Sequence, residues 1–163
     1  MPGRRNVLVA LVGGLAGCGF ELKRAPEFAF KSIRLAGFAA RSPLEMELRE
    51  RIGTSPSTVV VDNPAQAQVT LQGLTDAREK TVVASTAAGQ VTEFQLRLRL
   101  RFRLVNAAGK ELIGPTELLQ SRDLSYTESA ALAKEQEEAL LYRSMQGDVV
   151  SQVMRRLESV KAL

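Results

Sequence analysis

The sequence predicts an α+β fold, a two-layer sandwich in which two helices pack on one face of a four- to five-stranded, mostly antiparallel or mixed sheet. Three observations predict it. Residues 91–105 alternate apolar and polar side chains, which is the pattern of a long strand with one apolar face. Residues 43–53 and 128–160 repeat apolar side chains every three or four positions, as helices do. Short β-branched runs divided by turns that contain glycine or proline fill much of the remainder.

The amino-terminal segment has the pattern of a bacterial lipoprotein signal peptide, which we assign to residues 1–17. Arg4 and Arg5 precede an apolar run, residues 7–15, that is shorter than the roughly 20 residues needed to span a membrane. The run ends in Leu15-Ala16-Gly17-Cys18, which resembles a lipobox at all four positions. An ordinary signal peptide and a buried apolar helix are the alternatives. Because Cys18 is the only cysteine of the chain, we expect cleavage before it and acylation of the cysteine.

Lipidation sets the expected location of the mature protein. Gly19, and not an aspartate, follows the cysteine, which in lipoproteins of this kind usually goes with delivery to the outer membrane. We expect a chain anchored on the periplasmic side of the outer membrane, with a tether over residues 18–30 and a single domain over residues 31–163. Cleavage removes Arg4 and Arg5, so the excess of basic charge falls from four to two. This near balance argues against binding to nucleic acid.

The domain begins with a strand and a helix. Residues 31–38 alternate apolar and polar side chains, which predicts the first strand. A helix start follows, with an N-cap, a proline in the first turn and the acidic partner of a capping box: Ser42, Pro43 and Glu45. The apolar face of this helix consists of Leu44, Leu48 and Ile52. Gly53 ends the helix.

Two further strands are predicted before the long one. Residues 58–62 form a short β-branched strand. The next strand begins at Val69 and loses its alternation near Gly73-Leu74, where we expect a β-bulge. Residues 76–85 are too polar to assign to any element.

The long strand lies between two predicted hairpin loops, residues 86–90 and 106–109, each of which contains a glycine. The second hairpin leads into a strand over residues 110–126. If the apolar faces stay together, the cross-strand pairs are Leu104 with Leu112, Leu98 with Leu118, and Arg99 with Glu117. Pro115 lacks a backbone donor, which suits an edge strand or a bulge.

The last predicted element is a long helix over residues 128–160. Its apolar stripe consists of Tyr142, Met145, Val149, Val153, Leu157 and Val160. Gly147 in its middle costs about 1 kcal/mol relative to alanine. Both helices are expected to cover the apolar face of the sheet and to leave the other face, which carries the arginines of the long strand, open.

The chain lacks the residues of the common catalytic and metal sites. It contains no histidine, and the lipobox uses its one cysteine, which excludes Ser-His-Asp and Cys-His arrangements. No glycine-rich phosphate loop occurs in the mature part of the sequence. We therefore expect no enzyme, no cofactor and no metal site.

The remaining chemical feature is cationic. Arg97, Arg99, Arg101 and Arg103 share one face of the long strand, and guanidinium groups bind phosphate through paired hydrogen bonds. A solvent-facing row that discourages aggregation is the alternative. Lys134, early in the last helix, is a further candidate ligand for an anion, and ordinary surface charge of a helix is the alternative there.

Residues spread over most of the mature chain resemble those of LptE, a family of lipopolysaccharide-assembly lipoproteins of Gram-negative outer membranes. The matching residues are Cys18-Gly19 with Leu22, Gly89-Gln90 with Glu93-Phe94-Gln95, Arg122 and Tyr126, and on the last helix Ala131-Leu132-Ala133-Lys134, Glu137, Met145, Asp148 and Arg156-Leu157. The fold of that family, two helices on one face of a sheet, agrees with the fold predicted above.

The resemblance also implies a function. Members of the family form a plug inside the outer-membrane β-barrel protein LptD, where they assist barrel assembly and the delivery of lipopolysaccharide to the outer leaflet. They bind lipopolysaccharide through basic residues, one at the position of Lys134 and one in the hairpin loop where this chain has Ala87-Ala88. Our hypothesis is that the arginine row replaces the base missing from that loop. A purely structural plug without a glycolipid site, and a periplasmic hydrolase or nucleic-acid binder, are the alternatives.

Overall fold

Five strands and two helices make up the part of the chain that the computed structural model describes, residues 25–162. The strands form one mixed sheet in the order β2-β1-β3-β4-β5. Their bounds are β1 (Ser32–Ala36), β2 (Val59–Val60), β3 (Val69–Ser85), β4 (Val91–Asn106) and β5 (Glu111–Ser125). β1 runs parallel to β2 and β3, whereas β4 is antiparallel to both of its neighbours. The predicted lipidation site, Cys18, lies outside the described residues.

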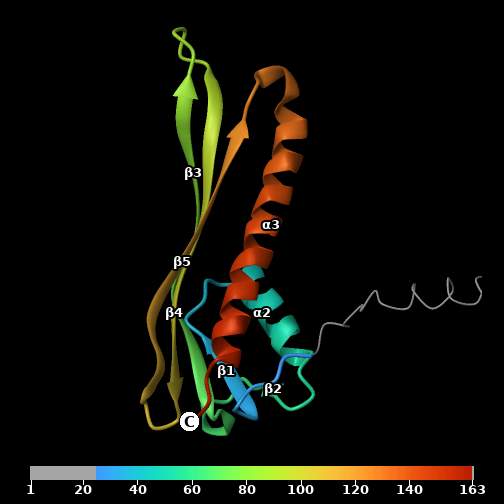
Figure 1. Cartoon of the computed structure of the whole chain (residues 1–163). Coiled ribbons are helices and arrows are strands. Elements are labelled where there is room, and N and C mark those ends of the chain that lie inside the picture. Colours follow the sequence, from blue (N-terminus) through green and yellow to red (C-terminus); the bar gives the residue numbers. More distant parts are fainter. Residues whose placement is uncertain (1–24, 163) are drawn as a thin grey trace, which may run out of the picture.

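Two α-helices lie on the same side of this sheet, as predicted. They are α2 (Pro43–Gly53) and α3 (Ala131–Glu158), and short 3₁₀ turns, η1 (Pro64–Gln66) and η2 (Glu128–Ala130), precede β3 and α3. Figure 1 shows that α3 runs along most of the length of the sheet, whereas α2 covers one end only. The tip of the β3–β4 hairpin lies at one end of the molecule, and α2, β1 and β2 lie at the other.

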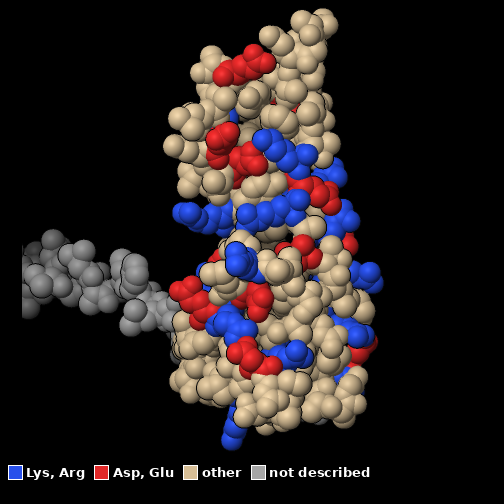
Figure 2. All heavy atoms as spheres, turned by 180° about the vertical axis from the view of Figure 1, so that it is seen from behind, with Lys and Arg blue, Asp and Glu red and all other residues tan. Residues whose placement is uncertain are grey.

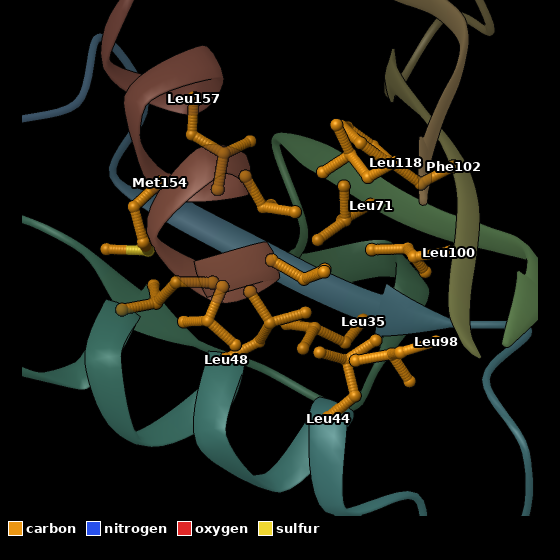
Figure 3. Packing of buried hydrophobic residues seen from close by; sticks show 14 of the residues in the cluster. Leu35, Leu44, Leu48, Leu71, Leu98, Leu100, Phe102, Leu118, Met154 and Leu157 are labelled. Atoms are coloured by element: carbon orange, nitrogen blue, oxygen red, sulfur yellow. The ribbon is translucent and has the colours of Figure 1, made fainter. Parts of the chain in front are cut away.

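The hydrophobic core fills the space between the sheet and the helices (Figure 3). The centre of the core consists of side chains from β4, each at most 1% exposed: Leu96, Leu98, Leu100, Phe102 and Leu104. Burial of one such side chain contributes about 1.5–3 kcal/mol. The predicted stripe of α3 packs on this floor: Tyr142, Met145, Val149, Val153 and Leu157 are buried, and Val160 is partly buried. Phe28 and Phe30, from the segment expected to be a tether, stack on each other and join the core.

The start of α2 confirms the predicted cap. The Ser42 hydroxyl oxygen accepts a hydrogen bond from the Glu45 backbone N–H at 3.1 Å, and Pro43 occupies the first helical position. Only half of a capping box forms, because the Ser42 N–H donates to the Ala39 carbonyl and the Glu45 carboxylate accepts from Arg49. The helix ends at Gly53, as predicted, and buries Leu44, Leu48 and Ile52.

A β-bulge divides β3 into two parts. The register against β4 shifts between Gly73 and Thr75, as predicted, and leaves Leu74 as the extra residue. Before the shift, Val69 and Leu71 face the helices and are buried. After it, the residues paired with the helix-facing side chains of β4 are polar or exposed: Asp76, Arg78, Lys80 and Val82. Residues 76–85, unassigned from sequence, therefore continue β3.

The predicted register between β4 and β5 is wrong over most of the pair. Val105 lies opposite Glu111, but Leu104 lies opposite Ile113 and not Leu112, and Leu98 lies opposite Gln120 and not Leu118. Two irregularities place residues 112–115 of β5 against residues 103–104 of β4, which inserts two residues into β5. An even shift keeps each side chain on its own face, so the apolar faces still meet. Pro115 lies in this irregular segment and on the edge strand, where its missing donor is tolerated.

Candidate functional site

The arginine row of β4 lies on the open face of the sheet. The apolar residues of β4, at its even-numbered positions, face the helices. The residues between them therefore project to the opposite side, and these include Arg97, Arg99, Arg101 and Arg103. These arginines are partly exposed to solvent, and Arg101 is the most exposed of the four. The four arginines therefore lie in a row on one face of β4, as predicted.

The partners of the row differ from the predicted ones. Arg99 does not face Glu117. It lies opposite Leu119, and its guanidinium is 3.9 Å from the carboxylate of Glu79 on the other neighbouring strand. The prediction failed because of the two residues inserted into β5, which bring Arg101 opposite Glu117 instead.

Two arginines for which the sequence predicted no partner also have one. Arg103 donates from Nε to the Gln72 side chain at 2.7 Å and from Nη1 to Glu111 at 3.1 Å. Arg97 donates to the Gln95 side chain at 2.8 Å. Within residues 25–162, Arg101 is the one member of the row whose side chain makes no hydrogen bond or ion pair. Figure 2 shows acidic and basic side chains intermixed over much of the face that is turned away from the viewer in Figure 1.

Lys134 lies on the other side of the sheet, so it does not share a site with the arginine row. Its ammonium group donates to the Ser125 hydroxyl at 3.0 Å and to the Glu137 carboxylate at 2.8 Å. It lines a cavity of about 120 Å³ between the first turns of α3 and the sheet, together with Phe94, Leu124 and Tyr126. The predicted binding residues thus form two separate groups, one on each face.

Lys80 is a second lysine of this cavity, which sequence reasoning missed. Its ammonium group is 2.6 Å from the Glu138 carboxylate and 4.2 Å from the centre of the Phe94 ring. A cation over an aromatic face gains about 0.5–2 kcal/mol. The signal that would have found it is the bulge at Leu74, because the shift in phase turns Lys80 toward α3.

A polar network continues from this cavity toward α2. The Gln146 side chain accepts from Arg78 at 2.7 Å and donates to the Pro43 carbonyl at 3.1 Å and to the Glu47 carboxylate at 2.7 Å. The Tyr142 hydroxyl donates to the Glu79 carbonyl at 2.7 Å. Burial, and then the nearby charge of Glu138, raise the pKa of Tyr142. Polar contacts, and not an apolar layer, therefore join this part of α3 to β3.

The cavity lined by the two lysines offers the chemistry of a binding site, because its cationic groups lie next to aromatic rings. Within residues 25–162, no three acidic residues gather into a group suited to a metal ion. None of the helices in that range is long and apolar enough to cross a membrane.

Comparisons with known proteins give the family. The model of the LptE family, described as lipopolysaccharide-assembly, matches residues 30–157. The LPS-assembly lipoprotein LptE of Pectobacterium atrosepticum is 26% identical over 163 residues, which cover 96% of this chain and 88% of that protein.

Solved structures show the same fold. The solution NMR structure of lipoprotein B from Nitrosomonas europaea superposes with a TM-score of 0.70 at 30% identity and covers 84% of this chain and 88% of its own. The crystal structure of rare lipoprotein B from Shewanella oneidensis gives a TM-score of 0.63 at 24% identity, over 79% of this chain and 95% of its own. The family match spans most of the chain, and its fold is the one described above. The chain therefore belongs to the LptE family of lipopolysaccharide-assembly proteins.

Proposed function

We propose that this protein is an outer-membrane lipoprotein that forms a complex with an LptD-type β-barrel and acts in the delivery of lipopolysaccharide to the outer leaflet. The observation that carries the proposal is the match to the lipopolysaccharide-assembly family over residues 30–157. The lipobox that ends at Cys18 supports attachment to a membrane through lipid. The relative from Pectobacterium atrosepticum is named an LPS-assembly lipoprotein, which supports a lipoprotein that acts in lipopolysaccharide assembly.

The glycolipid contact is assigned first to the cavity that Lys80 and Lys134 share. Two ammonium groups and two aromatic rings, Phe94 and Tyr126, suit an amphiphile that carries phosphate next to apolar groups. Both lysines are already paired with carboxylates, so a phosphate has to displace Glu137 or Glu138. A dianionic phosphate can do so, because bonds between ionised groups strengthen with charge.

The arginine row is the second candidate for this contact. Arg101 is exposed and unpaired within the described chain, whereas Arg97, Arg99 and Arg103 each face a partner. The purely structural plug stays as the alternative function, and the existing carboxylate partners of both lysines favour it.

One experiment separates these assignments. We replace the cavity lysines (Lys80→Gln with Lys134→Gln) in one variant and the row (Arg97→Gln, Arg99→Gln, Arg101→Gln and Arg103→Gln) in another. The control, Lys110→Gln with Lys161→Gln, removes two exposed charges remote from the cavity. We expect the lysine variant to bind fluorescent lipopolysaccharide at least about tenfold more weakly, a change of roughly 1.4 kcal/mol, and the control to match the wild type.

Co-purification with the barrel is measured on the same variants and tests the complex independently. We expect the lysine variant to keep the barrel, since its substitutions change no core residue. If both basic variants bind lipopolysaccharide as the wild type does, the basic sites are excluded and the structural plug stands. Failure of the wild-type protein to co-purify with any large outer-membrane barrel would contradict the proposed complex itself.

A further inference from the structure

A groove lies at the end of the molecule opposite the β3–β4 hairpin tip, between the last turn of α2 and the carboxy-terminal half of α3. Its volume is about 570 Å³, within the range of roughly 300–1,000 Å³ typical of ligand sites. Ser151 and Met154 of α3 line it, and Ala25 and Pro26 form one edge. The first described residues of the chain therefore lie at the mouth of the groove.

The charges of the groove come from both helices. Arg51 of α2 and Arg155 of α3 line it together, and Glu158 adds one carboxylate. Arg51 is 3.8 Å from Glu47, a distance at which the ion pair is weak and leaves the guanidinium accessible. The groove thus offers two guanidinium groups around the largely buried side chain of Met154, which is 8% exposed. It fits an occupant that combines apolar side chains with a carboxylate.

The chain immediately before Ala25 has this composition. Residues 19–24 read Gly-Phe-Glu-Leu-Lys-Arg, so apolar Phe20 and Leu22 alternate with Glu21 and Lys23. In an extended conformation, Phe20 and Leu22 share one face and Glu21 lies on the other. The segment from Cys18 to Ala25 reaches at most about 25 Å. Since Ala25 lies at the edge of the groove, Cys18 stays within that distance of the groove.

We propose that the groove binds this amino-terminal segment, residues 19–24. Phe20 and Leu22 pack toward Met154, and the carboxylate of Glu21 pairs with Arg51 and Arg155. Lys23 and Arg24 bring positive charge to the side of Glu158. The mature protein then has little free tether, and the lipid on Cys18 holds the α2–α3 end of the domain next to the membrane surface. The inference rests on the proposed cleavage at Cys18, which the intact mass of the purified protein verifies separately.

Disulfide trapping tests the proposal in the full, lipidated protein. Acylation uses the only native cysteine, so an introduced pair supplies the only thiols. We introduce Leu22→Cys with Ser151→Cys, and as a matched control Leu22→Cys with Ser144→Cys, which places the second thiol on an exposed position of the same helix. We expect the first pair to oxidise at least about tenfold faster, because a docked segment raises the effective concentration of its thiol.

Charge reversal tests the assigned ion pairs. With the first cysteine pair present, Glu21→Arg slows the oxidation, and addition of Arg51→Glu and Arg155→Glu restores it. Equal rates for the groove pair and the control pair would overturn the proposal. So would slower oxidation of the groove pair in the presence of phosphatidylglycerol vesicles, since that result would identify a lipid headgroup as the occupant.

Discussion

At the scale of single residues, Gly37 lies close against the backbone of β3. It follows β1 with a φ of +77°, and a Cβ atom there would collide with the carbonyl oxygen of Gly73, the residue before the β3 bulge. Gly89, in the hairpin loop, has a φ of +81° but open space around it. The two glycines therefore share the left-handed backbone and differ in the contact alone.

We predict that Gly37→Ala lowers the free energy of unfolding by more than about 2 kcal/mol, the sum of a left-handed backbone and a backbone collision. Gly89→Ala should cost about 1 kcal/mol, since the backbone term acts alone. Urea unfolding of both variants measures the difference. Equal losses would mean that the sheet relaxes around the collision.

Tyr142 gives the chain a stability component that depends on pH. Burial raises its pKa, so the folded protein holds this proton more tightly than the unfolded chain does. The stabilisation is complete below about pH 10, the ordinary pKa of tyrosine, and is lost as the pH rises through the higher pKa of the folded state.

We predict that Tyr142→Phe costs about 1 kcal/mol at neutral pH, because the hydrogen bond to Glu79 is lost. The difference from the wild type should shrink above pH 10, and a constant difference in urea unfolding across that range would contradict this account.

The sequence allowed only part of the binding surface to be predicted. The arginine row follows from the strict alternation of apolar and polar residues, and this pattern lies entirely within the sequence of β4. The partners of Arg99 and the place of Lys80 depend on irregular residues in the neighbouring strands, β5 and β3. Inserted residues leave weak local signals in the sequence. The sequence therefore predicts the face of the sheet on which a residue lies better than it predicts the residue opposite it on the next strand.

At the scale of secondary structure, Gln146 connects three elements through one amide. It joins β3 through Arg78 and α2 through Glu47 and Pro43, although it lies in α3 and is 8% exposed. We predict that Gln146→Leu lowers the free energy of unfolding by about 1–3 kcal/mol, because it leaves the groups around it without partners. Gln136→Leu, at an exposed position of the same helix, should change it by less than about 0.5 kcal/mol. Calorimetric melting of the two variants tests this, and equal effects would exclude the network as a source of stability.

The helices and the long strand were predictable because each carries its own signals. α2 has a cap, a proline and a glycine within its own sequence, and α3 has a continuous apolar stripe. Residues 76–85 lacked such a signal, because residues 78–80 meet α3 through charged and polar contacts instead of a core, and most of residues 81–85 are exposed. Their strand conformation comes from pairing with β4, which no local pattern reveals.

At the scale of the whole molecule, stability is expected to be uneven along its length. The core covers Leu96 to Leu104 of β4, whereas Val82 and Val83 near the hairpin tip are about half exposed, at 48% and 49%. We predict that amide protons of residues 81–92 exchange through openings of lower free energy than those of residues 96–104. Native-state hydrogen exchange followed by NMR measures both. Equal opening free energies would mean that the hairpin tip and the core unfold together.

The bulge at Leu74 has a consequence for how such a chain can change. One extra backbone residue exchanges the two sides of β3, so leucine and valine line the helix side before it, and aspartate, arginine and lysine line that side after it. Without the bulge, unbroken alternation through Leu74 would turn Lys80 outward and bring Glu79 to the helix side, toward Glu138 of α3. In this protein, the position of one insertion decides whether a charge faces the solvent or a cavity, and no change of residue type is required.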